Sequence, residues 1–135
     1  MANNVIANDV TYGYRNGGTQ DGTPTLSGTA TDFTCRITSH NESYTAKTVS
    51  QAGICATDDQ ALVTRYNGTE TFTMMVPSTG FVFKAMKGNY IEITEQVLAL
   101  TAEVRVGVIT GWSKGFSDDG NVTETITITY GVAGV

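Results

Sequence analysis

The chain has few of the residues from which catalytic and metal sites are built. Its 135 residues include one histidine, His40, and two cysteines, Cys35 and Cys55. A nucleophilic Ser or Cys needs a neighbouring base, but the one histidine, His40, stands in a polar stretch. The spacing of the two cysteines around His40 matches no zinc motif. We therefore expect neither enzyme activity nor a cofactor.

Two cysteines are also too few for a disulfide framework. In a reducing cytoplasm a free cysteine behaves as a small apolar residue, so we expect Cys35 and Cys55 to lie in the core. A disulfide between them is the alternative, and it requires their Cα atoms to approach each other.

Two acidic pairs and a glycine-rich stretch are the remaining candidate ligand sites. Asp58-Asp59 fits the first turn of a helix, where carboxylates are favourable, and Asp118-Asp119 fits a hairpin turn. Neither pair has EF-hand spacing. The stretch 16–22 lacks the preceding strand and the Gly-Lys-Ser/Thr ending of a phosphate-binding loop. We expect no metal ion.

Charged residues are also scarce, at 16% of the chain, and the net charge is −5. A negative surface repels phosphate groups, which disfavours a nucleic-acid reader but suits a surface past which DNA slides without binding. No apolar run approaches the roughly 18 residues of a membrane span. The first residues lack the basic and apolar segments of a secretory signal. We expect a protein that works where it is made, or leaves inside an assembled particle, without membrane contact.

Threonine supplies much of the polarity, with 23 copies. A β-branched polar residue favours strands that have one wet face. The chain has only two prolines and few long helix-forming side chains. We therefore predict a mainly β fold, an antiparallel β-sandwich or barrel with one short α-helix.

The chain divides into an N-terminal arm or loop, residues 1–24, and a single β domain, residues 25–135. Asn, Gly and Asp punctuate the first segment and leave no regular period. In the second, alternation of apolar and polar residues predicts strands, together with a polar loop over 39–43. The capping-box spacing between Thr57 and Gln60 predicts the helix, over about 58–65. The predicted strands cover 33–38, 44–51, 71–76, 81–83 and 90–97.

The C-terminal third predicts a long β-hairpin with two different faces. Alternate residues from Ala102 to Val108 are apolar, with Glu103 and Arg105 between them. In the last strand, isoleucines alternate with threonines, and residues 117–121 have the composition of a tight turn. We expect the Val/Ile face to be buried and the threonine face to meet a lumen or a neighbouring molecule.

The stretch from Thr101 to Gly131 resembles the closing hairpin of bacteriophage major tail tube proteins. It has a valine-rich strand, a Trp-Ser segment at Trp112, an acidic turn and an alternating strand that ends near a glycine. The segment 88–93 is placed like the preceding strand of that family. The resemblance implies hexameric rings that stack into a hollow tube, through whose lumen DNA passes without specific binding. It also implies a virion tail protein that assembles in the host bacterial cytoplasm with copies of itself and with other tail proteins.

Under this interpretation, the arm, the polar loop and the hairpin supply contacts between subunits. The alternative is a capsid decoration protein or a carbohydrate-binding β-sandwich, in which Trp112 and the tyrosines form a sugar-binding platform. The residues that we expect at assembly interfaces are Tyr12, Tyr14, His40, Glu42, Tyr44, Trp112, Thr123, Thr125 and Thr127.

Overall fold

Seven strands form one antiparallel sheet, in the order β2-β1-β5-β6-β7-β4-β3. The computed structural model describes residues 9–51, 60–116 and 120–133, with the backbone alone for residues 47–51, 60–66 and 132–133. Two short 3-10 turns, η2 (Thr34–Arg36) and η3 (Lys84–Met86), interrupt the connections. The strands are β1 (Val10–Thr19), β2 (Thr31–Asp32), β3 (Ile37–Gln51), β4 (Gln60–Met75), β5 (Asn89–Val97), β6 (Glu103–Phe116) and β7 (Val122–Ala133).

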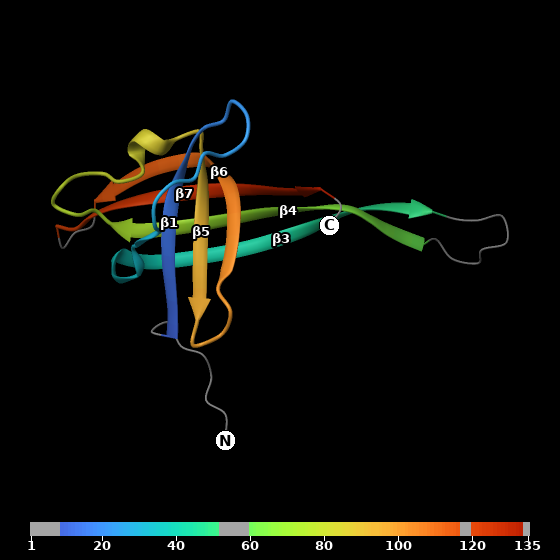
Figure 1. Cartoon of the computed structure of the whole chain (residues 1–135), viewed down its shortest axis with the longest axis horizontal. Coiled ribbons are helices and arrows are strands. Elements are labelled where there is room, and N and C mark those ends of the chain that lie inside the picture. The colour runs from blue at the N-terminus through green and yellow to red at the C-terminus, as the bar shows by residue number, and fades with distance from the viewer. Residues whose placement is uncertain (1–8, 52–59, 117–119, 134–135) are drawn as a thin grey trace, which may run out of the picture.

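The sheet folds over itself at β6, so that two layers of strands cross (Figure 1). The first half of β6, from Glu103 to Val108, pairs with β5, and the second half, from Val108 to Phe116, pairs with β7. A register shift between Ile109 and Gly111 lies at the corner, as expected because bulges bend strands. The mainly β, antiparallel prediction is confirmed. The barrel alternative is wrong, since the sheet stays open between β2 and β3.

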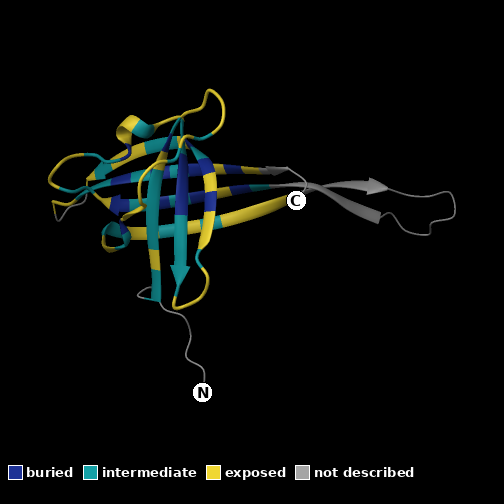
Figure 2. Ribbon diagram, in the orientation of Figure 1, coloured by how far each residue is buried: buried dark blue, intermediate teal, exposed yellow. Residues whose placement is uncertain are grey.

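The core lies between the two layers (Figure 2). Ile91 and Ile93 of β5 belong to the same buried cluster as Phe72 and Met74 of β4, and all four residues have 0% exposure. Burial of each such side chain contributes about 1.5–3 kcal/mol. The other buried apolar residues are Phe33, Phe83, Ile109, Ile126, Ile128 and Tyr130.

Strand β1 corrects the prediction of an arm or loop over residues 1–24. Residues 10–19 form this strand, which pairs with β5 from Val10 to Asn16. Tyr12 and Tyr14 pack against the core. They alternate with Gly13, which hides the two-residue period because glycine has no side chain. Residues 1–8 lie outside the described part of the chain.

The predicted strand over 33–38 is wrong in its first half, where η2 replaces it. Phe33 has 1% exposure, whereas Cys35, two residues on, is an exposed free thiol. A 3-10 turn has three residues per turn, so residues i and i+2 do not share a face as they would in a strand. Cys35 is therefore not a core residue, and Cys55 lies outside the described residues.

Two further elements differ from the prediction. Residues 60–65 belong to β4, not to an α-helix, and residues 39–43 continue β3 without a loop. The two strands pair along their whole length, from Ile37 to Gln51 on β3, and this ladder outweighs the local capping-box signal. Residues 81–83 form a bend, not a strand. None of the helices in the described residues is long and apolar enough to cross a membrane.

Strand β6 reverses the predicted faces of the C-terminal hairpin, although the hairpin itself and the buried isoleucines of β7 are confirmed. Val104 and Val106 are 54% and 40% exposed, while Arg105 is only 9% exposed. Gly107 is also buried, and a Cβ atom there would lie 2.7 Å from Tyr130 Cδ1. The valine face therefore points outward, and Arg105 points into the space between the layers.

Candidate functional site

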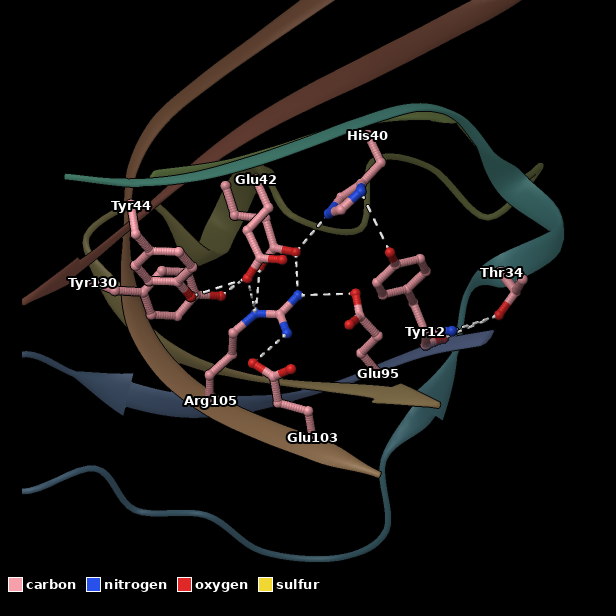
Figure 3. Close-up of polar contacts among 10 residues, drawn as sticks. Tyr12, Thr34, His40, Glu42, Tyr44, Glu95, Glu103, Arg105 and Tyr130 are labelled. Carbon is pink, nitrogen blue, oxygen red and sulfur yellow. Dashed lines mark hydrogen bonds and ion pairs between the residues drawn. The ribbon is translucent and has the colours of Figure 1, made fainter. Parts of the chain in front are cut away.

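Charged side chains from several strands point toward one another and form a cluster (Figure 3). At its centre is Glu70 of β4, which has 0% exposure. Its Oε1 accepts hydrogen bonds from the Tyr130 hydroxyl at 2.6 Å and from Arg105 Nε at 3.0 Å. Its Oε2 accepts from Arg105 Nη2 and lies 2.6 Å from His40 Nε2. Both carboxylate oxygens are thus fully used.

Arg105 of β6 carries the positive charge of this cluster. Besides Glu70, it lies near Glu42 Oε2 (3.1 Å from Nε), Glu95 Oε2 (3.5 Å from Nη2) and Glu103 Oε1 (3.4 Å from Nη1). The contact between Nη1 and Glu103 is an ion pair by distance but not a hydrogen bond, so Nη1 stays buried without a hydrogen-bond partner. One guanidinium therefore joins carboxylates from β3, β4, β5 and β6.

Three ring side chains, those of Tyr12, His40 and Tyr44, extend this ion-pair network by hydrogen bonds. The Tyr12 hydroxyl lies 3.3 Å from His40 Nδ1, and the Tyr44 hydroxyl donates to Glu42 Oε2 at 2.9 Å. A neutral His40 with its proton on Nε2 would donate to Glu70 and accept from Tyr12. The tyrosine rings and the imidazole thus complete a hydrogen-bonded network that includes residues of every strand except β2.

The charge distribution shifts several pKa values. Burial alone would raise the pKa of Glu70, but hydrogen bonds from His40, Arg105 and Tyr130 hold it below its ordinary value. Burial disfavours the charged form of Arg105, yet its contacts with Glu70 outweigh this and raise its pKa. Burial and then the negative charge of Glu70 raise the pKa of Tyr130. At neutral pH, Glu70 and Arg105 are therefore both charged.

Glu42, Tyr12 and Tyr44, at the edge of the cluster, all have raised pKa values, in contrast to Glu70. Burial raises the pKa of Glu42, and the opposing effect of Arg105 is smaller. The pKa values of Tyr12 and Tyr44 are raised, first by burial and then by Glu95 and Glu42 respectively. Both tyrosines therefore stay neutral and act as hydrogen-bond donors.

The cluster contains donor types that could hold a metal ion, since ligand atoms of His40, Glu42, Glu70 and Glu95 lie within 4.8 Å of one another. However, the Arg105 guanidinium contacts three of these four residues. A cation is thus already in place, and the carboxylates are neutralised from within the chain. We assign the cluster a structural role, the joining of the two layers.

The structure brings four of the nine predicted interface residues into this cluster: Tyr12, His40, Glu42 and Tyr44. Sequence reasoning missed Glu70 and Arg105. A signal exists for Glu70 alone, because it shares the two-residue period of Phe72 and Met74, whereas the period of residues 102–108 places Arg105 on the face opposite the valines. Tyr14 lies elsewhere, with its ring centroid 4.8 Å from that of Phe83.

Trp112 belongs to a second buried site, built around Glu124 of β7. Glu124 has 0% exposure and accepts from Trp112 Nε1 at 3.2 Å. It also accepts from the backbone N–H groups of Val82 and Phe83, at 3.0 and 2.9 Å. One carboxylate therefore anchors both the indole and the loop that follows β4.

The indole ring of Trp112 is occupied from several directions. The Nζ atoms of Lys84 and Lys87 each lie 5.5 Å from its centroid, within the range of cation–π attraction. The Phe81 ring meets it edge-on at 5.4 Å. A sugar ring would have to displace these groups, so the geometry disfavours a carbohydrate platform at Trp112.

The remaining predicted residues, Thr123, Thr125 and Thr127, lie on the outward face of β7. Register pairs them with residues of β4 on one side and β6 on the other. Thr125 Oγ1 lies 3.1 Å from Thr73 Oγ1 across the strand pair. The threonine side chains thus cover a continuous outer face of the sheet.

The sequence matches no protein-family model and no curated protein. Solved structures do match. A chain of the SPP1 tail tube, in a hybrid solid-state NMR and cryo-EM structure, has a TM-score of 0.68 and 14% identity, over 97% of this chain and 77% of that chain. The chain has the tail tube fold.

Two chains from gene transfer agent particles are similar as well. One is from the virion of a native particle, with a TM-score of 0.64, 12% identity and coverage of 99% of this chain and 96% of that chain. The other is from the tail of an empty particle with C6 symmetry, with a TM-score of 0.66, 14% identity and the same coverage. The predicted resemblance to tail tube proteins is thus confirmed at the level of the fold, and it covers nearly the whole chain.

Proposed function

We propose that the chain is a structural subunit of a virion tail tube, which forms stacked hexameric rings around a DNA-conducting lumen. The tail tube fold, shared with the SPP1 tail tube over 97% of the chain, carries this proposal. The C6 symmetry of the tail that contains a second similar chain supports six subunits per ring. The structural role of both buried carboxylate sites agrees with assembly in place of catalysis.

The shape of the subunit supports self-association. The ribbon of β3 and β4 extends beyond the rest of the body (Figure 1). From Thr48 to Gln51, β3 pairs with residues 60–63 of β4, whereas the pairing of β4 with β7 ends at Arg65. A ribbon of two strands is marginally stable alone. We therefore expect contacts with neighbouring subunits to support it.

The outward face of β3, β4, β7 and the second half of β6 has a distinctive chemistry, and we name it the hydroxyl face. Directly paired residues point to the same side of a sheet, so the registers define it. We define it from Thr69 to Thr73 of β4 with their register partners, where every side chain is uncharged; farther along the same strands, the registers reach Arg65 and Lys47. Its members are Ser39, Asn41, Ser43, Thr69, Thr71, Thr73, Gly111, Ser113, Thr125, Thr127 and Thr129.

We assign the hydroxyl face to the lumen. DNA binds proteins mainly through phosphate contacts with Lys and Arg, which release counterions. Within these bounds, the hydroxyl groups are wetted by water and offer no cation to hold a phosphate. The net charge of −5 further disfavours adhesion. A tube lined in this way would let DNA pass without binding it.

Substitution of lysines into the hydroxyl face tests the proposal. Purified wild-type protein should form hollow tubes in negative-stain electron microscopy. Thr125→Lys/Thr127→Lys should still form tubes, but these should retain short duplex DNA in a salt-dependent manner. The matched control, Thr23→Lys/Thr25→Lys, changes exposed loop residues by the same charge. A wild type without rings or tubes would refute the function, and equal DNA retention by both variants would refute the lumen assignment.

A further inference from the structure

The turn between β5 and β6 presents an apolar surface to solvent. Leu98 and Leu100 are 55% and 65% exposed. Val104 and Val106, on the outward face of the adjoining strand, are 54% and 40% exposed. We name these four residues the hairpin tip. Large apolar side chains that are exposed close together along the chain are typical of protein contact sites.

The backbone holds the hairpin tip in a fixed shape. Leu98 has a φ of 51° and is the one described non-glycine residue with positive φ, a conformation that costs energy for a bulky side chain. Its N–H donates to Asp9 O at 2.8 Å. The Gln96 side-chain amide donates to the carbonyl groups of Leu98, at 3.3 Å, and of Leu100. Three hydrogen bonds therefore hold this exposed leucine in a strained backbone conformation, as is typical of a contact surface that is already formed before binding.

A hollow of about 470 Å³ lies near the other end of β6. Phe116, which pairs with Val122 of this hollow, is 74% exposed, and Met75 in its lining is 39% exposed. Arg36 also lines it, and Arg36 Nη1 is buried without a hydrogen-bond partner. The complete lining is Arg36, Met75, Val76, Pro77, Gly120, Asn121 and Val122.

The hairpin tip and the hollow complement each other in three respects. One protrudes and the other is concave, both are largely apolar, and their charges are opposite. Glu103, between the leucines and valines of the tip, has a side chain that is 62% exposed, whereas Arg36 brings a cation to the hollow. The two surfaces lie near opposite ends of β6, Glu103–Phe116, so they cannot meet within one molecule.

We propose that the hairpin tip of one copy of this chain docks into the hollow of the next copy, with Glu103 facing Arg36. Such a contact joins different patches of identical subunits, and it therefore repeats head to tail, as a ring or a filament requires. This inference rests on the proposed function and adds to it the two surfaces through which the subunits meet.

Charge exchange tests the pairing directly. Glu103→Arg and Arg36→Glu should each reduce the fraction of assembled protein in sedimentation velocity at least tenfold, and the double variant should restore it. Asp21→Arg, which makes the same change at an exposed loop residue, should assemble like the wild type. Unfolding midpoints in urea check that each variant is folded. Assembly that is unchanged in both single variants, or lost equally in the double variant, would overturn the pairing.

A mixing experiment avoids any effect of Glu103 on its neighbour Arg105. Leu100→Asp inactivates the tip alone, and Met75→Asp inactivates the hollow alone. Each should fail to form rings, but a mixture retains one intact contact and should give a one-to-one heterodimer. If wild-type tubes form and both variants also form tubes, the docking proposal fails while the tail tube function stands. If the wild type does not associate at all, both fail.

Discussion

Glu70 and Arg105 form a buried ion pair that joins the two layers of the sheet, with Arg105 Nε 3.0 Å from Glu70 Oε1. Glu70 lies on β4 and Arg105 on β6, and their side chains are 0% and 8% exposed. The removal of two charges from water is costly, and it is offset only where hydrogen bonds satisfy the remaining oxygens and protons. His40 and Tyr130 satisfy those of Glu70. The pair therefore specifies how the layers meet.

We expect Arg105→Met to be strongly destabilising, because it leaves Glu70 buried without its main cation. The expected loss is about 3–5 kcal/mol in the free energy of unfolding, measured by urea denaturation. Adding Glu70→Leu to this variant should cost less than the sum of the two single changes, since residues in contact are coupled.

The control for this prediction is Glu103→Gln. Glu103 lies beside the same guanidinium, but its side chain is 62% exposed, and exposed ion pairs contribute at most about 1 kcal/mol. A loss for Glu103→Gln as large as that for Arg105→Met would show that burial of the pair is not the cause.

Stability should fall in mild acid because of Glu70. Its pKa is held below the ordinary value of 4.5, so its carboxylate form stabilises the folded state. This contribution is complete above that ordinary value, and it is lost as the pH decreases through the lower pKa of the folded protein. Urea midpoints between about pH 3 and pH 7 should show a steeper acid decline in the wild type than in Glu70→Gln.

Glu42 supplies the opposite sign and thus a control for the acid series. Its pKa is raised, so any contribution it makes is present at low pH and decreases as the pH rises through the folded value. Glu42→Gln should therefore keep the acid decline of the wild type. A flattened profile in Glu42→Gln and not in Glu70→Gln would contradict the assignment.

Periodicity predicted those strands in which apolar side chains alone decide the face. The alternation around Phe72 and Met74 and that of the isoleucines of β7 gave the correct strands and buried faces. It failed in β3 because His40 and Glu42 read as loop residues. Their partners are distant in sequence: Glu70, the partner of His40, is 30 residues away. The local sequence pattern therefore does not predict these contacts.

Strand β6 is a second case in which periodicity predicted the wrong buried face. Hydrophobicity predicted that Val104 and Val106 are buried and Arg105 is exposed, because the burial of a valine costs less free energy than that of an unpaired arginine. Glu70 reverses this preference by pairing with Arg105 between the layers. The valines then point outward, where they form half of the hairpin tip. A surface that we propose for assembly thus follows from a buried charge pair that periodicity does not reveal.

Gly107→Ala should destabilise the fold by about 1–3 kcal/mol, the usual cost of overpacking a core. An added Cβ would lie 2.7 Å from both Ile128 Cγ2 and Tyr130 Cδ1, and it would displace the Tyr130 ring that donates to Glu70. Gly111→Ala on the same strand is the matched control, since its nearest neighbour, Thr127 Cβ, would be 3.4 Å away. Thermal unfolding of the two variants measures the difference, and equal midpoints would refute the close approach.

Glu124→Gln should loosen the loop after β4 and change the surroundings of Trp112. The carboxylate accepts from two backbone N–H groups and from the indole N–H, whereas an amide offers one acceptor oxygen. A buried donor without a partner costs about 1–3 kcal/mol, so the urea midpoint should fall.

Because Trp112 is the only tryptophan, its emission reports on this site directly and should shift to longer wavelength in the folded variant. Asp21→Asn, a change of the same kind at an exposed carboxylate, should leave the emission unaltered. An unshifted spectrum for Glu124→Gln would mean that the indole is held by its contacts with Phe81, Lys84 and Lys87 alone.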